Sequence, residues 1–158
     1  MPALKPAAQR VQDALAAKGL DSSVRHMPQA TRSAAEAAAA CGCSLGQIVK
    51  SLLFRGATSG KPYLLLVSGA NRVNEQGVAA VIGEALRRPD ADDVREVTGF
   101  SIGGIPPLGH RTPLITLMDA ALLDYDLVWA AAGTPDAVFP VAPDRLAAAA
   151  EARIIALA

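Results

Sequence analysis

The sequence predicts an α/β (α+β) fold, in which helices flank a mixed, largely antiparallel central sheet. Three observations lead to this prediction. At least five apolar segments have the length and residue pattern of strands. Segments with helical periodicity separate several of them. Short turns at residues 56–61 and 133–136 join neighbouring strands, so hairpins outnumber crossovers, which argues against a doubly wound sheet. The 158 residues have the usual size of one domain, expected to span residues 1–158.

Each element has a local signal in the sequence. The expected strands cover residues 23–26, 48–54, 63–67, 114–118, 127–131 and 137–141. The expected helices cover residues 6–18, 34–40, 74–86, 92–97 and 143–151. Thr31 and Ser33 are candidate caps for the second helix, and Asn74 for the third. Pro89 is expected to end that third helix, whose buried stripe would contain Val78, Val81, Ile82 and Leu86. The glycines and prolines of residues 98–110 exclude regular structure there.

The composition limits the function classes. Lys and Arg total 15 and Asp and Glu total 15, so the chain has no net charge. Proteins that grip long nucleic acids through phosphates carry a basic excess, so DNA is not an expected partner. The ligand is either small or contacted over a small area. No apolar run is long enough to span a bilayer, and residues 1–6 lack the features of a signal peptide, so a cytoplasmic location is expected.

A metal site built on Cys41 and Cys43 could take its other two ligands only from His26 and His110. Structural zinc sites use four ligands, and this set is poor, so no metal is expected. No cofactor motif is present either. Part-buried thiols at a helix end are the better interpretation of the pair. In a reducing compartment a strained disulfide between them is excluded.

Lys50 is the first candidate functional residue. Strand alternation places it on one face with Ile48, Leu52 and Phe54, and both faces of this strand are mostly apolar. A lysine there lies at a sheet edge, extends its ammonium to water, or points it into a pocket. The residues alone leave the structural and functional interpretations equally open, because lysine is rarely buried without a partner.

The second candidate is the loop of residues 103–109. Its adjacent glycines allow the backbone to approach a ligand closely, and its prolines stiffen it. A structural turn is the alternative. His26 and His110 are weaker candidates, since no recognisable nucleophile motif accompanies them. Asp119 follows a strand and is expected to cap the next helix.

Taken together, three segments resemble the family of YbaK, EbsC, ProX and the prolyl-tRNA synthetase editing domain. They are Ile48-Val-Lys-Ser-Leu-Leu-Phe54, Thr98-Gly-Phe-Ser-Ile-Gly-Gly-Ile-Pro-Pro-Leu-Gly109 and Thr116-Leu-Met-Asp119. His26-Met-Pro28 with Thr31 resembles the opening of that family, and the resemblance covers nearly the whole chain. The combination of the lysine strand and the glycine loop, in this order and spacing, is specific.

The resemblance implies a freestanding hydrolase that deacylates a mischarged aminoacyl-tRNA. The tRNA would typically be tRNA-Pro carrying Cys, Ala, Ser or Thr. The resemblance implies a catalytic role for Lys50. The expected substrate-binding residues are His26, Thr31, Ser101, Gly103, Gly104, Ile105, Pro106, Pro107, Gly109, His110 and Asp119. The partner is the acceptor end of the tRNA, with prolyl-tRNA synthetase or an elongation factor as candidate protein partners.

Two other hypotheses remain open from the sequence. One is a binding module of the same fold that holds an aminoacyl or nucleotide ligand without turnover. The other is a thiol hydrolase that uses Cys41 or Cys43. An intact Lys50 and loop favour the deacylase over both.

Overall fold

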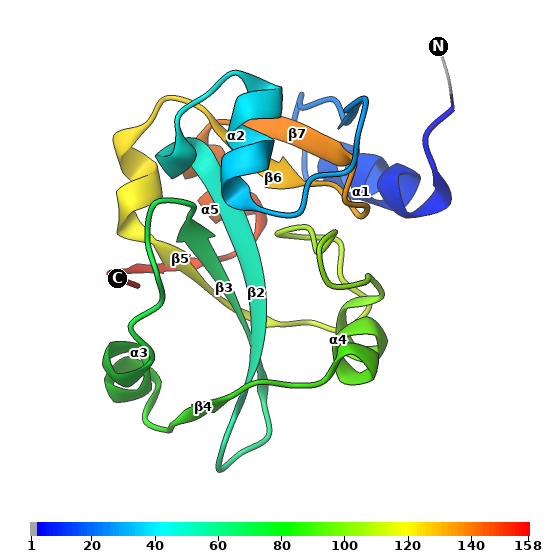
Figure 1. Cartoon of the computed structure of the whole chain (residues 1–158). Coiled ribbons are helices and arrows are strands. Elements are labelled where there is room, and N and C mark those ends of the chain that lie inside the picture. Colours follow the sequence, from blue (N-terminus) through cyan, green and yellow to red (C-terminus); the bar gives the residue numbers. More distant parts are fainter. Residues whose placement is uncertain (1–2) are drawn as a thin grey trace.

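A mixed sheet of eight strands runs through the molecule, and the computed structural model describes it within residues 3–158 (Figure 1). The strand order is β1-β7-β6-β2-β3-β5-β8, and β4 lies beside β2. The strands are β1 (Arg25–His26), β2 (Ile48–Gly56), β3 (Pro62–Ser68), β4 (Leu86–Arg87), β5 (Ile115–Asp119), β6 (Val128–Ala131), β7 (Ala137–Val141) and β8 (Arg153–Ile155). Four pairings are antiparallel, and the β2–β6, β3–β5 and β5–β8 pairings are parallel. The predicted mixed α/β fold is confirmed.

Helices cover both faces of this sheet. They are α1 (Pro6–Ala17), α2 (Ala34–Cys41), α3 (Glu75–Ile82), α4 (Ala91–Thr98) and α5 (Pro143–Ala149), with 3-10 turns η1 (Leu45–Gln47) and η2 (Ala120–Asp124). The larger core cluster joins α1, α4 and α5 to one face of the sheet through side chains such as Val11, Val94 and Leu146. On the other face, Val78 of α3 packs against Phe54 and Leu65.

Side-chain caps begin three of these helices. Ser33 accepts a hydrogen bond from Glu36 N at 3.1 Å, as predicted, and Asn74 accepts one from Gly77 N at 3.1 Å. Asp90 caps α4 through Asp93 N at 2.8 Å. A capping oxygen satisfies a backbone donor that has no partner within the helix.

The third helix is shorter than the sequence predicts. Gly83 ends α3 with a φ of 87°, a left-handed conformation that glycine adopts without a steric cost. Leu86 therefore leaves the helix and lies in β4, and Pro89 lies beyond that strand. Val81 turns to solvent with 40% of its surface exposed, so its assignment to the buried stripe was wrong.

Candidate functional site

A cavity of about 720 Å³ lies beside the middle of β2, within the volume range of small-molecule sites. Its walls come from four parts of the chain: the start of α2, strand β2, the segment that contains α4 and the glycine loop, and the β6–β7 hairpin. Its lining includes Thr31, Arg32, Lys50, Ser51, Leu53, Arg88, Gly103, Ile105 and Trp129.

The cavity exists because β2 has an interrupted edge. On the side away from β3, the strand pairs with β6 only at Ile48 and Val49, and with β4 only at Arg55 and Gly56. No strand of the described residues covers the stretch between these pairings. Residues from both faces of β2 consequently line the cavity, including Lys50 from one face and Ser51 from the other.

Lys50 is part-buried at this cavity and is held by the chain itself. Its Nζ donates a hydrogen bond to the carbonyl oxygen of Asn71 at 2.5 Å. Burial lowers the pKa of Lys50, and the nearby Arg72 lowers it further, while Asp119 opposes the shift. Its side chain shares a face with Leu52 and Phe54, opposite to the face on which Ile105 packs.

Asp119 fixes the carbonyl that holds the lysine. This carboxylate is 2% exposed, and its Oδ2 accepts from Ser68 N at 3.1 Å and from Asn71 Nδ2 at 3.0 Å. Its Oδ1 accepts from Ala121 N at 3.1 Å and so caps η2, as the sequence predicts. Asp119 thus orders the loop that positions the Lys50 ammonium, and it does not itself line the cavity.

The glycine loop reaches the cavity through Gly103 and Ile105. Gly103 has a φ of 95°, which favours glycine. Gly104 is required for a different reason: a Cβ there would lie 2.7 Å from the carbonyl oxygen of Gly133, and Gly133 N donates to Gly104 O at 2.9 Å. The glycine pair was expected to let the backbone approach a ligand closely. At Gly104 the backbone instead approaches the β6–β7 turn of the same chain.

His110 holds the far end of this loop. Its Nε2 lies 2.6 Å from the carbonyl oxygen of Pro106, and burial lowers the pKa of the imidazole. The neutral ring therefore donates from Nε2 to that carbonyl. His110 lines a second, smaller cavity of about 190 Å³, together with Pro107 and Gly109.

The predicted site residues thus divide into two groups. The structure brings Lys50, Thr31, Gly103 and Ile105 together at the larger cavity. The Thr31 hydroxyl is already engaged, since it donates to Pro135 O at 3.3 Å. The predicted residues outside the lining of this cavity are His26, Ser101, Gly104, Pro106, Pro107, Gly109, His110 and Asp119. Sequence reasoning missed Ser51, Arg32 and Arg88; the only available signal was a hydroxyl within the apolar pattern of β2.

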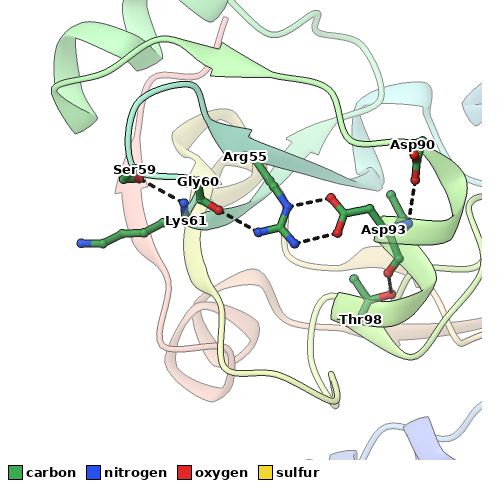
Figure 2. A network of polar contacts seen from close by, with 8 residues as sticks. Arg55, Ser59, Gly60, Lys61, Asp90, Asp93 and Thr98 are labelled. Atoms are coloured by element: carbon green, nitrogen blue, oxygen red, sulfur yellow. Dashed lines mark hydrogen bonds and ion pairs between the residues drawn. The ribbon is translucent and has the colours of Figure 1, made fainter.

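An ion pair joins the end of β2 to α4, next to residues that line the cavity (Figure 2). Arg55, at the end of the open stretch of β2, donates from Nε and Nη2 to the two carboxylate oxygens of Asp93, each at 2.6 Å. Its Nη1 donates to Gly60 O in the β2–β3 turn at 2.7 Å. The guanidinium therefore ties α4 to the hairpin, and this pairing lowers the pKa of Asp93.

Replacement of Asp93 by Asn is expected to cost about 0.5–1 kcal/mol of the free energy of unfolding at neutral pH, since the pair is partly exposed. The folded-state pKa of Asp93 lies below its unfolded value. The stabilisation is therefore present above about pH 4 and is lost as the pH falls through the folded pKa. Denaturant unfolding of the wild type and of Asp93→Asn should be measured from pH 7 to pH 2. The free energies of unfolding of the two proteins should converge at acid pH. Asp92→Asn, in the same helical turn, is the matched control; an equal loss there would assign the effect to the helix dipole instead.

No metal-binding group is evident in the described part of the chain: residues 3–158 contain no cluster of three or more His, Cys, Asp or Glu side chains suited to an ion. Cys41 and Cys43 are part-buried free thiols, as predicted. Burial raises the pKa of each thiol, which disfavours the nucleophilic thiolate, and neither lines the larger cavity. The arrangement does not favour a thiol hydrolase. Within the same residues, no helix is both long and apolar enough to cross a membrane.

Comparison with known proteins places this cavity in a family context. Residues 28–149 match the model of the aminoacyl-tRNA editing domain. Among solved structures, a candidate trans-editing enzyme for prolyl tRNA synthetase is 47% identical with a TM-score of 0.93, and the match covers 98% of each chain. A hypothetical protein of solved structure is 30% identical with a TM-score of 0.87, over 94% of this chain and 98% of that one.

Curated sequences give the same picture. The uncharacterized protein YwhH of Bacillus subtilis is 29% identical over 111 residues, which are 70% of each chain. A proline--tRNA ligase of Limosilactobacillus fermentum is 33% identical over 91 residues, 55% of this chain but only 16% of the ligase. The family match includes the lysine strand, the glycine loop and every wall of the cavity. The chain therefore belongs to the aminoacyl-tRNA editing domain family.

Proposed function

We propose that this chain is a freestanding deacylase that hydrolyses the ester of mischarged aminoacyl-tRNA in the cytoplasm. The substrate is tRNA-Pro carrying a small non-cognate amino acid such as Cys, Ala, Ser or Thr. The observation that carries the proposal is the 47% identity, over 98% of both chains, with a candidate trans-editing enzyme for prolyl tRNA synthetase. The protein finds its tRNA alone or in company with prolyl-tRNA synthetase or an elongation factor.

The charges at the cavity support a phosphate-bearing ligand. Arg32, Lys50 and Arg88 are the charged residues among those that line it, and all three are cations. Arg32 and Arg88 are exposed and can reach phosphates of the acceptor end, although Arg88 would first release its long, 3.5 Å ion pair with Glu75. A few local contacts of this kind are compatible with a net charge of zero.

The chemistry follows from what the cavity contains. Its lining offers no carboxylate, imidazole or thiol among the described residues, so no carboxylate or imidazole base is at hand to activate one of its hydroxyls. An aminoacyl ester is already activated, so a positioned water can attack its carbonyl carbon. The leaving ribose oxygen takes up the proton. Lys50 holds the terminal phosphate or the ester carbonyl. If it holds the carbonyl, its positive charge stabilises the negative charge that develops on the oxygen in the transition state.

The test is a panel of tRNA-Pro charged with Cys, Ala, Ser, Thr or Pro and incubated with the pure protein. The proposal expects release of at least one non-cognate amino acid while Pro-tRNA-Pro stays intact. Stoichiometric binding of a mischarged tRNA with no release of its amino acid would favour the alternative of a non-catalytic binding module. Neither binding nor release with any member would reject both.

Deacylation is expected to need no metal ion. The proposed mechanism uses only a lysine cation, a water and the substrate. Activity should survive extended dialysis against a chelator, with less than one zinc per chain by elemental analysis. A loss of activity that added zinc restores would contradict the expectation; Cys-alkylated protein assayed in parallel separates metal removal from thiol damage.

A further inference from the structure

Ser51, one of the residues that line the larger cavity, carries a polar atom that the fold leaves unsatisfied. The Oγ of Ser51 is buried and has no hydrogen-bond partner among the described residues. Ser51 lies on β2 between Val49 and Leu53, whose side chains pack in the larger core cluster. Buried hydroxyls are almost always hydrogen-bonded, because desolvation without a partner is costly. In a residue that lines a cavity, such a hydroxyl can be satisfied by a ligand group or a water once the side chain turns toward the cavity.

The backbone beside this hydroxyl is also open. Ile48 O accepts from Gly69 N, and Gly56 N donates to Lys61 O, each across from β3. In an antiparallel pair the hydrogen-bonded residues alternate, so the even-numbered residues of β2 bond to β3 and the odd-numbered ones point away from it.

The odd-numbered residues near the two ends of β2 are paired with other strands: Val49 pairs with β6 and Arg55 pairs with β4. Between them, Ser51 and Leu53 direct their N–H and C=O groups toward the cavity that both residues line. No backbone or side-chain hydrogen bond to these four groups occurs within residues 3–158.

We propose that this open edge of β2, formed by the backbone of Ser51 and Leu53 and by the Ser51 hydroxyl, binds the aminoacyl part of the substrate as an extra strand residue. The ligand class is an α-amino acid ester with a free amino group. The inference rests on the proposed function and deepens it. The α-ammonium donates to a carbonyl of the edge, and the ester carbonyl accepts from an N–H of the edge.

The hydrogen-bonding groups of the β2 edge match those of an aminoacyl ligand. A strand residue offers its neighbour one donor and one acceptor on the same side, and an extended aminoacyl group carries the same pair in its amino nitrogen and its carbonyl oxygen. Addition of a strand-like ligand to a sheet edge is an established mode of recognition. This mode of binding contacts only the groups that all amino acids share. Selection among amino-acid side chains must therefore come from the apolar walls of the cavity. The Ser51 hydroxyl supplies a further contact at the same place.

The first test is Ser51→Ala, with Ser68→Ala as its matched control. Ser68 is also a buried serine, on β3, but its hydroxyl donates to Gly46 O at 2.8 Å. Ser51→Ala should reduce kcat/KM about tenfold, mainly through KM, without lowering the melting temperature, because no protein contact is lost. Ser68→Ala should lower the melting temperature. If Ser51→Ala keeps wild-type kinetics, or loses stability as Ser68→Ala does, the role of the hydroxyl is overturned.

The second test varies the ligand and uses the wild-type protein. The best substrate of the mischarged panel is compared with its desamino analogue, for example alanyl-tRNA with propionyl-tRNA. Loss of a charged donor should slow hydrolysis roughly tenfold to a hundredfold. Equal rates overturn the inference while leaving deacylation intact, whereas no hydrolysis of any member rejects the proposed function itself.

Amide hydrogen exchange provides a readout independent of turnover. The probe is 3′-alanylamino-3′-deoxyadenosine, whose amide link is not hydrolysed. In the free protein, the amides of Ser51 and Leu53 should exchange faster than those of Leu52 and Phe54, which bond to β3. Saturating probe should slow exchange at Ser51 and Leu53. Exchange at these two amides that is unchanged by bound probe would overturn the edge-binding inference.

Discussion

Lys50→Ala is expected to lower the single-turnover rate of deacylation by about a hundredfold to a thousandfold, the loss seen when a charge-stabilising donor is removed from a reacting carbonyl. Lys50 lines the cavity, and its ammonium is held by a hydrogen bond to Asn71 O. The fold should remain intact, since burial lowers the pKa of Lys50 and a charged ammonium there costs stability. Unfolding should therefore require the same or a slightly higher denaturant concentration.

Lys50→Arg is expected to restore only part of the rate. Arginine keeps the charge, but its planar fork is wider than an ammonium and cannot make the same single bond to the carbonyl of Asn71. Lys61→Ala, an exposed lysine in the turn next to β3, is the control and should match the wild type in rate and stability. A Lys50→Ala protein that hydrolyses its tRNA at the wild-type rate would refute the catalytic role. A variant that unfolds would assign this lysine to structure.

Gly104→Ala is expected to impair both stability and deacylation. Its Cβ would lie 2.7 Å from Gly133 O and 2.8 Å from the Cα of Thr134, which are backbone atoms that cannot rotate away. Overpacking of this kind costs roughly 1–3 kcal/mol of unfolding free energy. The strain should displace Gly103 and Ile105 from the cavity wall, and a shift of about 1 Å in a substrate-positioning wall is enough for a hundredfold loss of rate.

The control for this variant is Gly19→Ala. Gly19 also needs a special conformation, with a φ of 75°, but a Cβ there would meet no atom within 4 Å. It should cost stability through its backbone alone, roughly 1 kcal/mol, and leave the deacylation rate unchanged. Thermal melts and single-turnover assays on both proteins separate the two effects. A Gly104→Ala variant as stable and as active as the Gly19→Ala variant would show that the backbone contact is not tight.

Local signals in the sequence were sufficient for most of the secondary structure. Alternation and apolar runs predicted the five longest strands, and Ser33 and Asn74 predicted the starts of two helices. The two-residue and three-residue strands β4 and β8 were missed. Unlike residues 23–26, which predicted β1, these two segments lie outside any alternating run, and they become strands because β2 and β5 offer them edges.

The site could be predicted only where a residue was unusual for its local pattern. Lys50 in an apolar strand met that condition, and so did the glycine loop. Ser51 did not, because a serine on a strand is unremarkable until its hydroxyl is known to lack a partner. The interruption of pairing along β2 depends on β6 and β4, which lie far from it in sequence, so no local pattern could reveal it. The roles of the individual site residues remain predictions.

The shortness of the open edge of β2 has a consequence for solubility. Exposed strand edges invite pairing with other molecules and are a common start of aggregation. Here only Ser51 and Leu53 are open, between segments that β6 and β4 already occupy. A foreign strand needs a longer run of free backbone than this gap allows, whereas a single aminoacyl group does not. This gap can therefore accept a ligand group but is too short to pair with a further strand.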